Sequence, residues 1–102
     1  MMNNDKQGST TSVDLQTIIF FCKANERVYQ KMLYERFYGF ALTIVFRYVC
    51  KHDKAMDTVN NGFIKVFKHV STLEVVDAAD TEKMLMTWLE KIMVNTAKNC
   101  SN

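Results

Sequence analysis

The sequence predicts an all-α protein, a compact bundle of four helices. The chain of 102 residues contains no proline and only three glycines, so it lacks the residues that usually mark hairpins and long loops. Hydrophobic residues make up 48% of the chain and charged residues 24%, as in a globular domain with one core and unlike a disordered chain. Apolar residues also recur at steps of three and four, which is the spacing of one side of a helix.

The first twelve residues, MMNNDKQGSTTS, are polar and do not form a signal peptide. We expect residues 1–12 to be a disordered tail and residues 13–102 to form the helical domain. Thr11 and Asp14 have the spacing of a capping box, which predicts a short first helix over about residues 13 to 23. Its apolar side consists of Val13, Ile18, Ile19, Phe20 and Phe21.

A long second helix is predicted from Glu26 to Cys50, with Asn25 as its N-terminal cap. Apolar residues recur at helical spacing along it: Val28, Met32, Leu33, Phe37, Phe40, Ala41, Ile44, Val45 and Tyr48. The second half is apolar over most of its circumference, so we expect neighbouring helices to cover it on more than one side.

The third helix is predicted from near Asp53, as N-cap, to about His69. One face is apolar, with Ala55, Met56, Val59, Gly62, Phe63, Val66 and Phe67. The opposite face carries Asp57, Asn60, Asn61, Ile64, Lys65 and Lys68. A single surface isoleucine needs no functional explanation. An apolar residue surrounded by amides and charges is also typical of the centre of a protein-binding patch.

Residues 71 to 80 interrupt the helical pattern, and a fourth helix is predicted from about Thr81 to Asn99 with Asp80 and Thr81 at its cap. Its core side comprises Leu85, Trp88, Leu89, Ile92, Met93 and Thr96, so Trp88 is interpreted as a core residue. A second, polar stripe comprises Thr87, Lys91, Asn95 and Lys98. This stripe is either a solvated helix face or a ridge that lies along an extended anion and offers amides to base edges.

Other features narrow the class of protein. The formal charge of +2 does not by itself indicate a nucleic-acid partner. The three cysteines have no CxxC spacing, which argues against a disulfide framework and fits a reducing cytoplasm. Cys50, His52 and His69 lack the partners that would complete a tetrahedral metal site. No apolar run is long enough to insert into a membrane, and no catalytic motif or cofactor-binding loop is present, so neither an enzyme nor a cofactor is predicted.

Three stretches carry a resemblance to a known family: RFYGFALTIVFRYVC, DKAMDTVNNGFIKVFKHV and TWLEKIMVNTAKN. In this order they resemble the region 2 domain of bacterial RNA polymerase sigma factors of the extracytoplasmic-function group. The second stretch matches the family pattern at Ala55, Asp57, Val59, Phe63, Ile64, Val66 and Phe67. The third matches it at Trp88, Leu89, Ile92, Asn95 and Ala97. The resemblance covers about residues 14 to 99.

The resemblance implies a transcription initiation factor with two binding surfaces. The third helix would bind the β′ clamp helices of RNA polymerase through Asp57, Asn60, Asn61, Ile64 and Lys65. The fourth helix would recognise and melt the minus-ten element of promoter DNA by holding its non-template strand through Lys91, Asn95, Lys98 and Asn99. Asn95 would read an extruded base. Catalysis would belong to the polymerase, and an anti-sigma protein is a further partner that the resemblance implies.

The chain departs from the family pattern in three respects. Asn60 and Asn61 stand where the family commonly has glutamine followed by an acid, which weakens charge-assisted contacts to the clamp. Residues 71–80 contain three acids and no Arg or Lys, a poor lining for single-stranded DNA. The second, helix-turn-helix domain of such factors is absent, so we expect either a domain fragment or a natural short form. The alternative function is a helical protein-interaction domain that no longer binds DNA.

Overall fold

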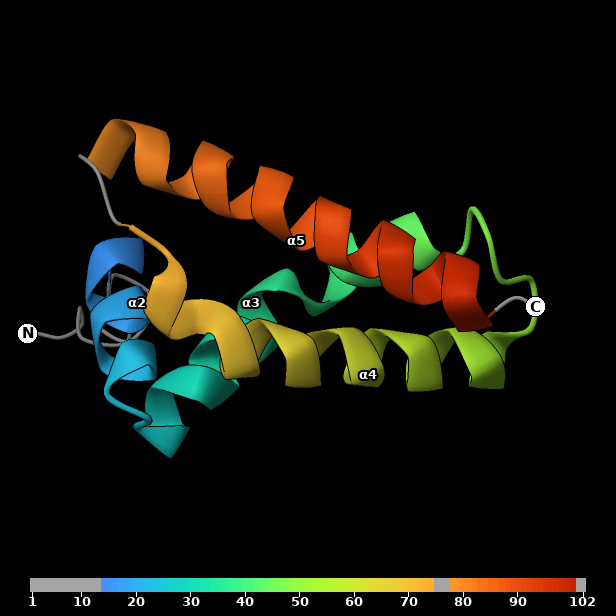
Figure 1. Ribbon diagram of the computed structural model, residues 1–102, viewed down its shortest axis with the longest axis horizontal. Helices are drawn as coiled ribbons and strands as arrows, with labels where there is room; N and C mark the ends of the chain where they lie inside the picture. Colours follow the sequence, from blue (N-terminus) through green and yellow to red (C-terminus); the bar gives the residue numbers. More distant parts are fainter. Residues whose placement is uncertain (1–13, 75–77, 101–102) are drawn as a thin grey trace, which may run out of the picture.

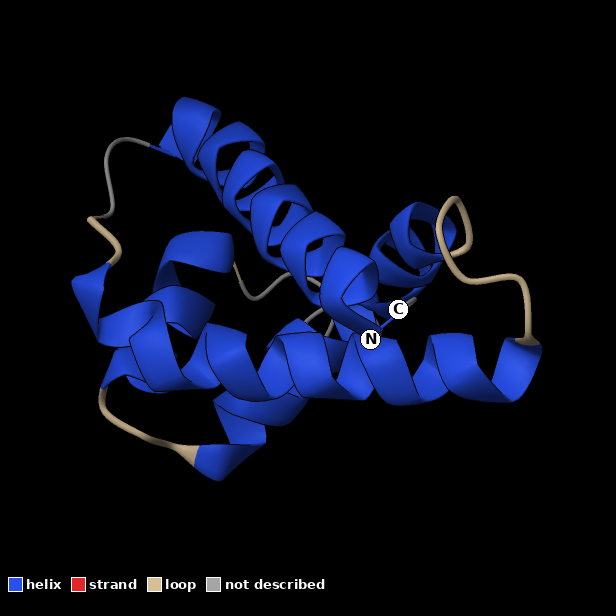
Figure 2. Ribbon diagram, turned by 45° about the vertical axis from the view of Figure 1, so that its right-hand side comes forward, coloured by secondary structure: helices blue, strands red, loops and turns tan. Residues whose placement is uncertain are grey.

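The computed structural model describes residues 14–74 and 78–100. This part of the chain forms four α-helices, α2 (Leu15–Lys23), α3 (Arg27–Val45), α4 (His52–His69) and α5 (Ala78–Cys100), and one 3-10 turn, η1 (Val70–Thr72). Figures 1 and 2 show helices joined by short connections and no strand among the described residues. The predicted all-α bundle of four helices is therefore confirmed. Both α3 and α5 contact each of the other three α-helices.

The first helix begins later than the sequence predicted. Asp14 is the N-cap of α2, and its carboxylate accepts a hydrogen bond of 2.8 Å from the Thr17 N–H. This bond lowers the pKa of the Asp14 carboxyl, because the charged form is the better acceptor. Thr11, the other half of the predicted capping box, lies outside the described residues.

Asn25 ends α2 and does not cap α3, contrary to the prediction. It adopts a left-handed backbone with φ of 68°. Its N–H donates to the Cys22 carbonyl, and the following Glu26 N–H donates to the Phe21 carbonyl. These two bonds form a Schellman motif, in which asparagine tolerates the left-handed position better than most residues. The N-cap of α3 is Glu26, without a side-chain hydrogen bond to the helix.

The predicted end of the long helix at Cys50 is wrong, since α3 ends at Val45. The Arg47 and Tyr48 N–H groups bond three residues back, to Ile44 and Val45, so the helix tightens into a turn. This turn allows Val49 to point into the core, where it is 4% exposed. Val28 and Tyr48, predicted to face inward, are exposed instead, because they lie at the two ends of this segment, beyond the cover of neighbouring helices.

The starts of α4 and α5 also differ from the prediction. The N-cap of α4 is Lys51 rather than Asp53, and α5 begins at Ala78 rather than at Thr81. Asp53 and Asp80 lie within the first turns of these helices, where a negative charge interacts favourably with the positive end of the helix dipole. The predicted loop, residues 71–80, is therefore shorter, and its residues 75–77 lie outside the described part.

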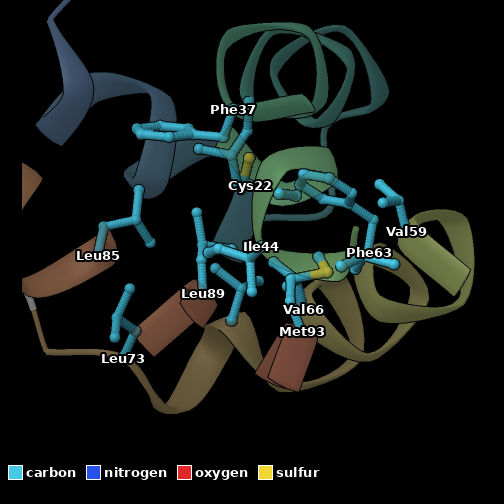
Figure 3. Close-up of a cluster of buried hydrophobic side chains, with 14 of the residues drawn as sticks. Cys22, Phe37, Ile44, Val59, Phe63, Val66, Leu73, Leu85, Leu89 and Met93 are labelled. Atoms are coloured by element: carbon cyan, nitrogen blue, oxygen red, sulfur yellow. The ribbon is translucent and has the colours of Figure 1, made fainter. Parts of the chain in front are cut away.

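The hydrophobic core collects side chains from all four helices and from Leu73 (Figure 3). The fully buried members with the largest side chains include Phe63, Ile19, Leu33, Ile44, Leu85, Leu89 and Met93. Thr58 and Thr96 are also buried, and each hydroxyl donates to a backbone carbonyl one turn earlier, which satisfies the polar group. Trp88 and Ile92 are half-buried and pack against the core, as the sequence predicted.

Candidate functional site

The outward side of α4 is a polar face with one apolar residue in it. We call this set the α4 face: Asp57, Asn60, Asn61, Ile64, Lys65 and Lys68. All six side chains are exposed, and Ile64 is 64% exposed. The opposite side of the helix is buried through Ala55, Val59, Phe63 and Val66. The helical period predicted most of this division correctly, because burial on α4 alternates with the same period as the apolar residues. Met56 is the exception, since it was predicted on the apolar face and is 36% exposed near the N-terminus of the helix.

Two members of the α4 face are held by the neighbouring helices. The Tyr34 hydroxyl of α3 donates a hydrogen bond of 2.7 Å to Asn60 Oδ1. The Lys65 ammonium donates a bond of 3.2 Å to Thr96 Oγ1 of α5. Desolvation by burial, with a further contribution from Tyr38, raises the pKa of Tyr34. Asn60 and Lys65 thus mark the edges of the face, and Ile64 lies between them.

The outward side of α5 carries the residues predicted to bind DNA. We call this set the α5 face: Lys91, Asn95, Lys98 and Asn99. All four are exposed on the C-terminal half of the helix, within about two turns. Glu90 is a neighbour in sequence, and Glu82 and Lys83 lie further toward the N-terminus, so basic residues predominate only beyond Glu90. An array of amides and lysines of this kind can donate to phosphate oxygens and pair with base edges.

The two faces meet at the seam between α4 and α5. Lys65 was predicted to contact the polymerase, but its ammonium is directed toward α5 and bonds to the residue that follows Asn95. The structure therefore places Lys65 between the two predicted binding sets. The sequence could not show this, because the contact joins residues 31 positions apart.

The described residues line several open grooves that were not predicted. The first, of about 460 Å³, lies where the beginning of α3 meets the end of α4 and is lined by Asn25, Arg27, Gln30, Lys31, Tyr34 and Phe67. The second, of about 410 Å³, lies between α3 and α5 and is lined by Phe40, Glu82, Lys83, Met86, Thr87 and Glu90. The only sequence signal for the first was the spacing of Arg27 and Lys31, one helical turn apart.

The described residues contain no group of three or more His, Cys, Asp or Glu side chains arranged to hold a metal ion. Within the same part of the chain, no helix has both the length and the apolar character needed to span a membrane. Cys22 is buried and Cys50 is exposed, and both are free thiols.

Comparison with known proteins adds no family to these observations. No protein-family model matches the chain, and neither a curated protein nor a solved structure matches it. The two faces and the residues that form them are therefore the observations that bear on function.

Proposed function

We propose that this chain is a sigma factor region 2 domain of the extracytoplasmic-function group. It binds the β′ clamp helices of RNA polymerase through the α4 face and holds the non-template strand of the promoter minus-ten element through the α5 face. The observation that carries the proposal is the position of Ile64, which is 64% exposed at the middle of an otherwise polar helix face. The resemblance of three sequence stretches, in order, to the family pattern supports it.

The α4 face has the chemistry of a small protein-binding surface. Burying a fully exposed isoleucine gains about 1.5–3 kcal/mol, and interfaces obtain most of their affinity from a few such central residues. Around Ile64, amides and charges supply the polar rim. The side chain of Asn60 is held in one orientation before a partner binds, because the Tyr34 hydroxyl donates a hydrogen bond to its side-chain oxygen. A partner helix that packs on Ile64 would therefore meet a surface that is partly ordered beforehand.

The α5 face has the chemistry of a single-strand binding surface. Lys91 and Lys98 supply positive charge for phosphates, while Asn95 and Asn99 supply paired donors and acceptors for bases. Binding through these lysines weakens as the salt concentration rises.

The test of the polymerase-binding proposal is Ile64→Glu. We expect this variant to lose capture of core RNA polymerase, because a carboxylate at the centre of a closed interface is desolvated without a partner. The fold should be retained, since the side chain is solvated in the free domain. The measurement is co-purification of core polymerase with the tagged chain, together with a thermal melt followed by circular dichroism.

Phe20→Glu is the matched control. Phe20 on α2 is also 64% exposed, so the control introduces the same charge at a site of equal exposure on another helix. Its capture of polymerase should equal that of the unmodified chain. Equal capture by Ile64→Glu and the unmodified chain would show that the α4 face is not the polymerase contact.

A second candidate function is a helical protein-interaction domain that does not bind DNA. The observation that favours it is the groove beside Thr87, where Glu82 and Glu90 both line the wall. Two carboxylates next to the predicted DNA path would repel a phosphate backbone. In this case the α4 face keeps its role and the α5 face is a solvated surface.

A further inference from the structure

The groove between the beginning of α3 and the end of α4 is positively charged. Two of its lining residues, Arg27 and Lys31, are cations one turn apart on α3, and Asn25 and Gln30 add side-chain amides. None of the described residues that line it is acidic. Lys31 pairs with Glu35, whose carboxylate lies 4.0 Å from the Lys31 ammonium, with both side chains largely exposed. An exposed ion pair at this distance contributes little to stability, so Lys31 can exchange Glu35 for the carboxylate of a bound partner.

Arg27 occupies a position that is unfavourable for the stability of its own helix. It is the first residue of α3, no acid lies in the first turn, and Glu26 makes no side-chain cap. A cation at this end opposes the helix dipole. Residues that break a local rule of this kind are often kept for binding.

The aromatic walls of the groove are committed to internal packing. The Tyr34 ring lies 4.9 Å from Phe63 and 5.2 Å from Tyr38, measured between ring centroids. Phe67 stacks on Phe63 at 6.0 Å. Single-stranded nucleic acids bind to aromatic rings with free faces, whereas these rings serve as walls. The cations and amides are therefore the groups that recognise a ligand here, and they suit a carboxylate.

The groove is continuous with the α4 face. Tyr34 lines the groove, and its hydroxyl donates a hydrogen bond to Asn60 Oδ1 of that face. Phe67, on the other wall, follows Ile64 by three residues, about one helical turn. A helix that docks on Ile64 and runs across the seam between α3 and α4 therefore passes over the opening of the groove.

We propose that the groove receives an aspartate or glutamate side chain of the same protein helix that docks on the α4 face. This inference rests on the proposed function, because it assigns a second contact to that partner. Arg27 and Lys31 bind the carboxylate. Gln30 Nε2 donates a hydrogen bond of 3.1 Å to Asn25 Oδ1, and the remaining amide N–H groups of this pair supply further donors. The groove thus adds a charge-dependent contact to a face whose centre, Ile64, is apolar.

The test is the double charge reversal Arg27→Glu/Lys31→Glu, with core RNA polymerase as the probe. At low salt we expect the variant to bind at least about tenfold more weakly than the unmodified chain, because two attractive contacts become repulsive. The difference should shrink at high salt, since exposed charges are screened. Loss of the helix is not expected to explain the result, because glutamate at the first position of α3 favours the helix dipole.

Arg36→Glu/Arg47→Glu is the matched control. It makes the same change in net charge at two exposed positions that do not line the groove. Its affinity for polymerase should stay within about twofold of the unmodified chain, because isolated surface charges contribute little. Equal weakening by both double variants would overturn the inference, since the effect would then follow net charge.

The remaining outcomes separate this inference from the proposed function. If Ile64→Glu abolishes binding and Arg27→Glu/Lys31→Glu does not weaken it, the groove inference is wrong and the proposed function stands. If the unmodified chain does not bind polymerase, both fail. If the groove variant keeps polymerase affinity but loses binding to a single-stranded oligonucleotide, the groove is a nucleic-acid site and the inference is overturned.

Discussion

Cys22 and Cys50 carry the same side chain in opposite surroundings. Cys22 is 2% exposed within the core, where desolvation raises the pKa of its thiol from 9.0 to about 11. Cys50 is exposed between α3 and α4. The thiolate is the reactive form of cysteine, so of these two thiols we expect only the exposed one to react readily.

Cys50→Ser/Cys100→Ser leaves Cys22 as the single thiol and tests this expectation. At pH 8 its alkylation in the native chain should be at least about a hundredfold slower than in urea, because two pKa units leave about one hundredth of the thiolate. The raised pKa also stabilises the fold below pH 9, and this contribution is lost as the pH rises toward 11. Equal alkylation rates in the native and unfolded states would contradict the burial of Cys22.

At the scale of the element, Gly62 sets how closely α4 and α5 pack. A Cβ at this position would overlap Met93 Sδ and lie 2.8 Å from Met93 Cε. Met93 is fully buried, so its side chain has little room to move. Gly39 of α3 is the opposite case, because a Cβ there would meet nothing within 4 Å.

Gly62→Ala should lower the free energy of unfolding by about 1 kcal/mol, since overpacking costs about 1–3 kcal/mol and outweighs the gain of about 1 kcal/mol in helix propensity. In a Met93→Ala background the same change should be stabilising, because the clash is gone. Gly39→Ala is the control and should stabilise by about 1 kcal/mol. Urea denaturation of the double-mutant cycle measures the coupling, and additive effects would exclude the contact.

At the scale of the whole molecule, the two faces lie on neighbouring helices, and a hydrogen bond from Lys65 of the α4 face to Thr96 joins these helices. Their central residues, Ile64 and Asn95, are both exposed and sit on different helices. Substitutions far from a shared contact act independently. Polymerase binding and DNA binding should therefore be separable by mutation.

Asn95→Ala is expected to change the base preference for single-stranded minus-ten oligonucleotides while leaving polymerase capture unchanged. The reason is that an amide can form paired hydrogen bonds with a base edge and alanine cannot. Asn61→Ala on the α4 face is the control and should leave oligonucleotide binding unaltered. Fluorescence anisotropy over a series of oligonucleotides measures both. Undetectable oligonucleotide binding by every variant, including the unmodified chain, would favour the second candidate function.

The sequence by itself determined the all-α class and most of the division of the helices into buried and exposed sides, although Phe20, Val28 and Tyr48, predicted on apolar sides, are exposed. Ile64 could be placed outside, and Val59 and Phe63 inside, because side-chain direction along a helix repeats with a local period of 3.6 residues. The same reasoning misplaced helix ends, as at Val45 and Asn25, where backbone turns toward the core decide the boundary.

Only the tertiary structure decided which surfaces adjoin. The bond from Lys65 to Thr96, the bond from Tyr34 to Asn60 and the groove beside Arg27 each join residues from different helices. Such contacts depend on how the helices cross, and the crossing is set by the packing of the shared core around residues such as Gly62 and Met93. Periodicity along one helix contains no information about that crossing.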